Sequence, residues 1–383
     1  MIPTDVLTAF GFAPDAHQLP FAEAGNINTN AVRVVTDTHD EWLFQKLNTS
    51  VFPLPERVMS NAFQWHWASN TLALVNPELG WRNIGFAVTE QEHGLVDGWR
   101  AIRLMPDVTN YRSLQSAPEN AAFELGRGLA VSRAIGRMLV ADEIPPSLPG
   151  YRDSELYWRQ YQAVVSGDPT PFLPTDPEVL KATKPHFSRA ETAEVIEARL
   201  SSTHGRHLSQ LLKSHLDLAR EIPNRVASGD LDCTVIHGDT KLDNFLFDRR
   251  TGAICALIDL DTVMPHSWLV DFGDTIRSVA NPAGEVPARL EDVTFDLKSY
   301  KATVEGFQDL EPDLSSAEQE AMTIAPLALA WEQCLRFYTD WIRGNTYYQA
   351  PDNELNLYRA LAQARLLENM AVARDAGELG TFG

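Results

Sequence analysis

The sequence contains few cysteines, few positive charges and no long apolar run. Its 383 residues include three cysteines without a pair motif, an odd number that supports no disulfide framework. Lysine and arginine number 32 against 52 acidic residues, and this net charge of -20 argues against binding to nucleic acid or anionic lipid. No apolar run approaches the roughly 18 residues of a membrane span. Because the first basic residue is Arg33, we expect no signal peptide and a cytoplasmic protein.

The distribution of apolar residues predicts two lobes. Hydrophobic residues make up 44% of the chain, which is enough for a sizeable core. Short β-prone runs, among them 31–35 and 41–47, dominate the first third, whereas apolar residues recur at helical spacing near the end, as in 328–342. We therefore predict an α+β fold, with a small strand-rich lobe over residues 1–105 and a larger helical lobe over 106–383.

Two segments of the larger lobe lead to more specific predictions. Residues 191–220 form a long stretch of helical pattern and are expected to make one helix. Several prolines occur between residues 145 and 174, and this composition indicates an irregular surface connection.

The most informative segment runs from residue 233 to residue 277. It contains the pattern H-G-D-x-x-x-x-N, which begins at His237 and directly follows a β-prone run. A predicted hairpin comes next, and its second strand ends on a carboxylate. The loop and the hairpin end therefore carry four polar side chains of interest: Asp239, Lys241, Asn244 and Asp259.

These residue types suit phosphoryl transfer from ATP. A carboxylate must orient the attacking hydroxyl and accept its proton, and Asp239 fits that role. Magnesium prefers hard oxygen ligands, usually one or two from the protein, and Asn244 and Asp259 supply an amide and a carboxylate oxygen. Lys241 is placed to help neutralise the phosphate during transfer. The pattern therefore predicts a magnesium-dependent kinase.

The segment after the hairpin also fits a second chemistry. Residues 259–263 (DLDTV) imitate the D-x-D-x-T motif of haloacid-dehalogenase-like phosphatases, in which the first aspartate becomes an aspartyl phosphate. That motif normally opens a Rossmann-like domain near the chain start, whereas this one lies two-thirds along the chain. The phosphatase hypothesis is therefore the weaker of the two.

The whole segment resembles the aminoglycoside phosphotransferase and choline kinase family, whose members share the protein-kinase-like fold. Within that family the chain resembles the N-acetylhexosamine 1-kinases most closely. The likeness extends from about residue 25 to 370. It rests on GNINTNAVRVV (25–35) with LNTSVFPLPERVMSN (47–61), HGDTKLDN through DFGDTIR, LRFYTDWIRGNTYY (335–348) and WRAIRLM (99–105).

The resemblance implies a kinase that transfers the γ-phosphate of ATP to the anomeric hydroxyl of an N-acetylhexosamine. Adenine would lie at a hinge near Leu104 and Met105. A glycine-rich phosphate loop is absent, so only Gly25 is available to approach the phosphates. On the third strand Gln45 and Lys46 face opposite sides, and the resemblance assigns the ATP-facing position to Gln45. The sugar contacts that it implies are Asn28, Arg336 and Tyr347.

Other interpretations of the sequence stay open. The acceptor could be an amino alcohol or an aminoglycoside, which the acidic charge would tolerate. Because the phosphate loop and the third-strand lysine are weak, a pseudokinase-like nucleotide-binding module is a further alternative. Arg336 could instead belong to a solvated ladder of ion pairs with Glu332 and Asp340, and Tyr347 could be a packing residue.

Overall fold

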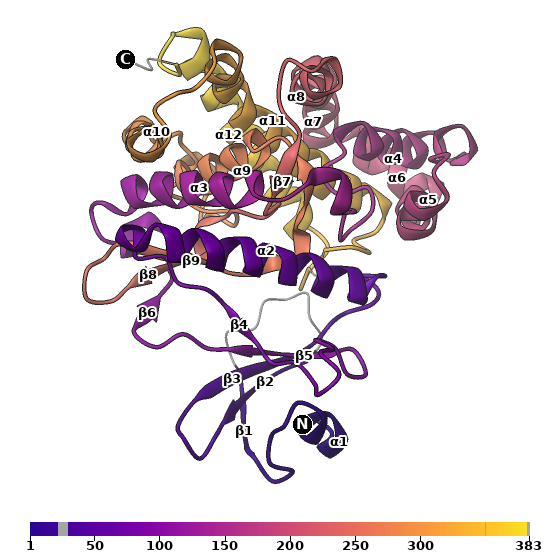
Figure 1. Cartoon of the computed structure of the whole chain (residues 1–383). Helices are drawn as coiled ribbons and strands as arrows, with labels where there is room; N and C mark the ends of the chain where they lie inside the picture. The colour runs from indigo at the N-terminus through magenta and orange to yellow at the C-terminus, as the bar shows by residue number, and fades with distance from the viewer. Residues whose placement is uncertain (22–29, 349, 381–383) are drawn as a thin grey trace.

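A five-stranded antiparallel sheet forms one end of the molecule, and helices form most of the other (Figure 1). The computed structural model describes residues 1–21, 30–348 and 350–380. The strand order is β1-β2-β3-β5-β4. The strands are β1 (His17–Pro20), β2 (Asn30–Val35), β3 (Glu41–Lys46), β4 (Gly85–Phe86) and β5 (Trp99–Arg103).

The two faces of this sheet differ in chemistry because side chains alternate along each strand. Phe44 lies opposite Ala101, and both are buried in a cluster with residues of the N-terminal helix α1 (Thr4–Ala9). Gln45 lies opposite Arg100 in the same pair of strands. Since residues directly opposite each other share a face, Gln45 and Arg100 lie together on the face away from α1.

Helix α2 (Pro55–Val75) lies between the sheet and the helical part of the chain (Figure 1). Pro55 stands in its first turn, where a missing backbone N–H costs nothing. Asn61 of α2 donates hydrogen bonds to the carbonyl oxygens of Pro145 and Val263, at 2.8 and 3.0 Å. One buried amide thus fastens α2 to two separate segments of the helical part.

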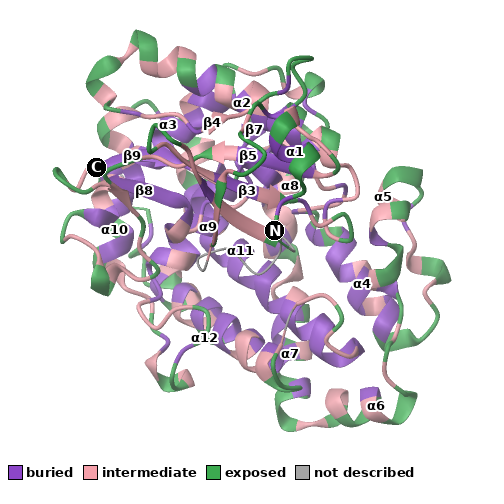
Figure 2. Cartoon of the chain, turned by 90° about the horizontal axis from the view of Figure 1, so that it is seen from below, coloured by how far each residue is buried: buried purple, intermediate pink, exposed green. Residues whose placement is uncertain are grey.

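The remaining helices pack around α11 (Ser316–Arg343), which is buried along most of its length (Figure 2). A capping box formed by Ser315 and Glu318 sets where α11 begins. Helices α9 (Leu269–Val279) and α12 (Leu355–Asp375) pack against it, whereas α3 (Ala121–Arg137) and α10 (Leu297–Leu310) pack against each other. Two small antiparallel sheets complete this part: β6 (Val108–Thr109) with β8 (Phe245–Asp248) and β9 (Ile254–Leu257), and β7 (Thr234–Ile236) with β10 (Met264–His266).

The α+β prediction is confirmed, but two local predictions are wrong. Residues 191–220 do not form one helix, because Ser202 is extended and its hydroxyl accepts the N–H of Gly205, which starts a new helix. The prolines of 145–174 flank a helix that the composition concealed. The helices concerned are α4 (Ser154–Ser166), α6 (Ala193–Ser201), α7 (Thr203–Ser214) and α8 (Leu216–Ser228).

Within the described residues, no helix combines the length and apolar character that crossing a bilayer requires.

Candidate active site

The loop over residues 237–244 connects β7 to β8 and is held from below by α9. The carboxylate of Asp271 accepts the backbone N–H groups of His237 and Gly238, at 2.9 and 2.8 Å. Gly238 has φ +86°, and a Cβ at this position would lie 2.6 Å from the carbonyl oxygen of Thr262. Only glycine therefore combines this backbone conformation with this close approach.

His237 orients the 237–244 loop as a neutral side chain. Its Nε2 lies 2.9 Å from the carbonyl oxygen of Ile258, and its Nδ1 lies 3.2 Å from the backbone nitrogen of Asp239. The first contact needs a proton on Nε2, so Nδ1 accepts. Burial lowers the pKa of His237 to about 4. The imidazole is therefore uncharged near neutral pH and fixes the loop between two strands.

Two of the predicted side chains, those of Lys241 and Asn244, contact Asp239. The Nζ of Lys241 lies 2.9 Å from Asp239 Oδ2. The Nδ2 of Asn244 donates to the backbone carbonyl of Asp239 at 2.7 Å and to Oδ2 at 3.0 Å. Because both of these bonds use the amide nitrogen, the amide oxygen of Asn244 is left to face other groups.

The surroundings of Asp239 keep it ionised. Burial alone would raise the pKa of this carboxyl, but the cations Lys241 and Arg152 hold it well below its usual range. The Asp239 carboxylate in turn raises the pKa of Lys241. The loop therefore presents two charged groups, the Asp239 carboxylate and the Lys241 ammonium group, to a bound ligand.

Asp259 follows β9 and lies beside the 237–244 loop. The backbone N–H of Ile258 donates to the carbonyl oxygen of Asn244 at 2.9 Å, which places Asp259 one residue away from that contact. Asp259 adopts the left-handed conformation, with φ 69° and ψ 60°. Strained backbone of this kind is common at functional sites. Among the described residues the structure gives its carboxylate no hydrogen-bond donor.

The Asp259 carboxylate lies close to a second carboxylate, that of Asp261. Its surface is open to solvent on one side, but protein atoms surround it closely, and this loss of hydration together with the Asp261 carboxylate raises its pKa to about 7. The strand that precedes it belongs to an antiparallel sheet. The phosphatase interpretation is therefore wrong, because its nucleophile motif requires the parallel sheet of a Rossmann-like domain.

The buried ion pair between Arg100 and Asp261 joins the five-stranded sheet to the segment after β9. The two side chains are 3% and 4% exposed, and they pair through both carboxylate oxygens. Arg100 also donates to Gln45 Oε1, from Nη2 at 2.9 Å and from Nε at 3.2 Å. Sequence reasoning missed Arg100, although a charged residue between Trp99 and Ala101 in a β-prone run was a signal.

This buried pair leads to a stability prediction. Asp261→Ala should lower the free energy of unfolding by about 3–5 kcal/mol, because it leaves the Arg100 guanidinium buried without a counter-charge. Asp309→Ala, which removes an exposed partner of Arg127, is the control and should cost no more than about 1 kcal/mol. Urea unfolding measures both. Equal, small losses in the two variants would show that the Arg100–Asp261 pair contributes little.

The residues predicted to hold a nucleotide lie near this ion pair or at the end of β5. Gln45 points to the Arg100 side of β3, whereas Lys46 is exposed. Leu104 and Met105 directly follow β5, and Met105 packs against the buried part of the β8–β9 hairpin. Gly25 and Asn28, which were predicted to approach the phosphates and the sugar, lie outside the described residues.

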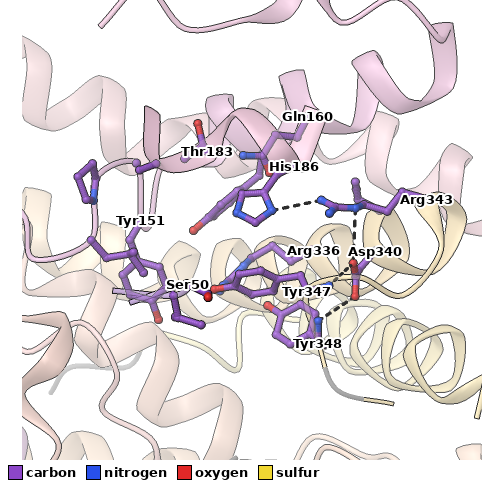
Figure 3. A pocket seen from close by; sticks show the side chains of 17 residues that line it. Ser50, Tyr151, Gln160, Thr183, His186, Arg336, Asp340, Arg343, Tyr347 and Tyr348 are labelled. Atoms are coloured by element: carbon purple, nitrogen blue, oxygen red, sulfur yellow. Dashed lines mark hydrogen bonds and ion pairs between the residues drawn. The ribbon is translucent and has the colours of Figure 1, made fainter. Parts of the chain in front are cut away.

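Arg336 and Tyr347, which lie eleven residues apart in the sequence, line one pocket (Figure 3). The pocket has a volume of about 690 Å³, counting its open mouth. Its walls come from α4, from α11 and the turn after it, from the segments after β3 and before α4, and from residues 182–186. Tyr348, which the sequence offered with Tyr347 as a possible pocket wall, also lines it, as do five polar and aromatic residues that were not predicted: Tyr151, Tyr157, His186, Asp340 and Arg343.

The solvated-ladder interpretation of Arg336 is wrong. Its side chain is 11% exposed, and Glu332 and Asp340 on the same helix are buried. The carboxylate of Asp340 accepts the backbone N–H groups of Thr346, Tyr347 and Tyr348, which shapes the turn after α11. The charged face of α11 therefore builds the pocket instead of covering a surface.

Arg152 connects this pocket to the 237–244 loop. Its guanidinium donates twice to the carbonyl oxygen of Gly238, at 3.0 and 2.8 Å, and to Glu332 of α11 at 3.0 Å. The adjacent Tyr151 lines the pocket. Burial raises the pKa of its hydroxyl, and the negative charge of Asp239 raises this pKa further. The pocket is thus linked through Tyr151 and Arg152 to Gly238, the residue that precedes Asp239.

This combination of fold and site defines a class of protein. The structure is similar over its whole length to a microcompartment-associated aminopropanol kinase, with a TM-score of 0.59, 14% identity, and 99% and 98% of the two chains covered. It is also similar to an aminoglycoside phosphotransferase from Alicyclobacillus acidocaldarius, with a TM-score of 0.52, 14% identity, and 98% and 96% coverage. The fold is therefore the protein-kinase-like α+β fold, as predicted.

A family model narrows this class. Residues 21–303 match the model of the phosphotransferase enzyme family, the group that includes aminoglycoside phosphotransferases. The match covers most of the chain and includes the 237–244 loop and Asp259. The chain belongs to this phosphotransferase enzyme family.

Proposed function

We propose that this protein is an ATP- and magnesium-dependent kinase that phosphorylates a sugar, with the anomeric hydroxyl of an N-acetylhexosamine as the acceptor. One observation carries the proposal. The loop that presents Asp239, Lys241 and Asn244 is tied through Arg152 to a pocket lined by Arg336 and Tyr347. A phosphotransferase needs this proximity between a proton acceptor and an acceptor pocket.

In the proposed reaction the acceptor hydroxyl attacks the γ-phosphorus of ATP, and the bond to ADP breaks. The hydroxyl proton passes to the Asp239 carboxylate, which the nearby cations keep ionised. Lys241 stays protonated and offsets charge on the transferring phosphoryl group. Asn244 holds the Asp239 carboxylate in place through its amide nitrogen.

The residues present fit a magnesium ion. Asp259 supplies a carboxylate that the structure leaves without a donor among the described residues. Loss of hydration and the neighbouring Asp261 carboxylate raise its pKa, and a dication bound there would stabilise the ionised form. The amide oxygen of Asn244, whose nitrogen is engaged by Asp239, supplies a second hard ligand. When bound there, magnesium would offset negative charge on the phosphates of ATP.

The nucleotide is proposed to bind between two lobes, one over residues 1–105 and the other over residues 106–383. Leu104 and Met105 at the end of β5 would contact adenine, and Gln45 would face the phosphates. The exposed position of Lys46 supports this choice between the two third-strand residues. Arg100, which lies beside Gln45, brings a fixed cation to the same face of the sheet. Gly25 and Asn28 remain proposals from the sequence.

The acceptor pocket suits a sugar better than an aliphatic alcohol. Arg336 and its neighbours offer hydrogen-bond donors, and the tyrosines offer flat apolar walls of the kind that pack against a sugar ring. A site that pairs hydroxyls discriminates strongly against analogues that leave its polar groups unpaired. The similarity to an aminopropanol kinase concerns the fold alone, so amino alcohols remain the competing acceptor class.

An acceptor screen tests the proposal. ATP consumption would be followed in the presence of N-acetylglucosamine, N-acetylgalactosamine, choline, aminopropanol and an aminoglycoside, each with and without magnesium. We expect turnover with an N-acetylhexosamine only. Turnover confined to an amine would replace the sugar by an amino alcohol or aminoglycoside. ATP binding without turnover on any acceptor would indicate a pseudokinase-like module.

A further inference from the structure

We propose that Arg336 fills a tyrosine cage with the protein's own cation, so that the acceptor pocket admits neutral or anionic sugars and excludes acceptors with an ammonium group. This inference rests on the proposed function and deepens it, because it names the charge class of the acceptor. It also implies that an acylated amino sugar is accepted where the corresponding free amine is rejected.

The cage consists of four tyrosine rings around the Arg336 guanidinium. The guanidinium carbon lies 4.9 Å from the ring centroid of Tyr157 and 5.3 Å from that of Tyr151. It lies 5.6 and 6.0 Å from those of Tyr348 and Tyr347. Figure 3 shows Arg336 next to the rings of Tyr347 and Tyr348. All four distances fall within the range of attraction between a cation and an aromatic face.

Aromatic cages of this kind commonly bind quaternary ammonium ligands. Here the position that such a ligand would take is occupied by a side chain of α11. A second cation brought into the pocket would meet the charge of Arg336, whose side chain is only 11% exposed, and water screens repulsion between like charges less at such a position than in bulk solution. The faces of the tyrosine rings that are turned to Arg336 are already engaged by its charge and are not available to a second cation.

The charges around Arg336 do not cancel its own. Its Nη1 donates to Gln333, a neutral partner, at 2.8 Å. Glu332 is 3.8 Å away, but its carboxylate lies closer to Arg152, at 3.0 Å. Asp340 is engaged by three backbone N–H groups of the following turn.

The other titratable groups of the lining add no free negative charge. Arg343 is a second cation, and it contacts the Nδ1 of His186 at 3.2 Å. Burial and these arginines lower the pKa of His186 to about 4, so the imidazole is neutral at physiological pH. Among the described residues that line the pocket, the two arginines therefore outnumber the one aspartate.

A matched pair of probes tests the inference without requiring turnover. Choline and 3,3-dimethyl-1-butanol have nearly the same shape, but only choline is charged. Binding of each to the full-length protein would be measured by ligand-observed NMR in the absence of ATP. The wild type is expected to show no preference for choline. A preference of the wild type for choline would overturn the inference.

The variant Arg336→Met removes the charge and keeps a side chain of similar length. It is expected to bind choline at least about tenfold more tightly than the wild type and to prefer it over the neutral alcohol. Arg336→Lys, which keeps a cation in the cage, is the matched control and should continue to exclude choline. A folded Arg336→Met protein without this gain would overturn the inference, and the wild-type comparison decides the matter if that variant does not fold.

These outcomes are distinct from those of the acceptor screen. A kinase that phosphorylates an N-acetylhexosamine but binds choline in preference to the alcohol keeps the proposed function and loses the charge filter. A protein with the binding pattern expected of the filter, but without phosphate transfer to any sugar, loses the proposed function instead.

Discussion

Asp239→Asn is expected to lower turnover by about 10²–10⁴-fold while the fold and the affinity for ATP stay unchanged. The asparagine amide keeps an oxygen that can accept from Lys241 and Asn244, which now donate to Oδ2 at 2.9 and 3.0 Å. It cannot, however, take a proton from the acceptor hydroxyl. Steady-state kinetics on a confirmed acceptor, together with ATP binding by calorimetry, measure the two effects separately.

Asp243→Asn is the matched control for this prediction. Asp243 lies on the same 237–244 loop, and among the described residues its carboxylate has no hydrogen bond to another side chain of the site. Its removal changes the net charge by the same amount, so its turnover should stay near that of the wild type. If Asp239→Asn retained the activity of this control, Asp239 would not be the proton acceptor.

Asp259→Ala is expected to raise the magnesium concentration for half-maximal activity on the order of 10–100-fold. The reason is the loss of a full negative charge and of a hard oxygen ligand at the proposed metal position. Asn244→Ala should raise it less, because the amide is neutral, but it should also lower turnover, since Asn244 holds the Asp239 carboxylate. Activity titrated with magnesium at saturating ATP checks both variants.

The same titration on Asp243→Asn separates a ligand from a nearby charge. This variant should leave the magnesium requirement close to that of the wild type. A wild-type magnesium requirement in Asp259→Ala would contradict the assignment of Asp259 as a ligand.

The features that could be predicted from the sequence are those that depend on residues close to each other in the chain. The 237–244 loop was predicted from the H-G-D-x-x-x-x-N pattern, whose glycine takes the positive φ that the loop requires. The strand before it was predicted from its β-prone residues. The close approach of Lys241 and Asn244 to Asp239 follows from their few residues of separation. The pairing of Arg336 with Tyr347 came only from resemblance, because no local rule brings them together.

What the sequence could not predict depends on long-range packing. Arg152 lies in a short connection. Its role depends on hydrogen bonds to the carbonyl of Gly238 and the carboxylate of Glu332, which lie in segments distant in the sequence. The sequence allowed Arg336 to be part of a solvated helix face, because charged residues at helical spacing usually form ion pairs on an exposed surface. Its burial against Tyr151 and Tyr157 depends on how α4 and α11 pack.

Phosphorus NMR of the reaction product tests the central claim most directly. The protein would be incubated with ATP, magnesium and N-acetylglucosamine or N-acetylgalactosamine, and the product would be examined before and after mild acid. The account predicts a glycosyl 1-phosphate that releases inorganic phosphate in acid, together with one equivalent of ADP. An acid-stable phosphate on another hydroxyl or on an amino alcohol, with the N-acetylhexosamines unchanged, would contradict it.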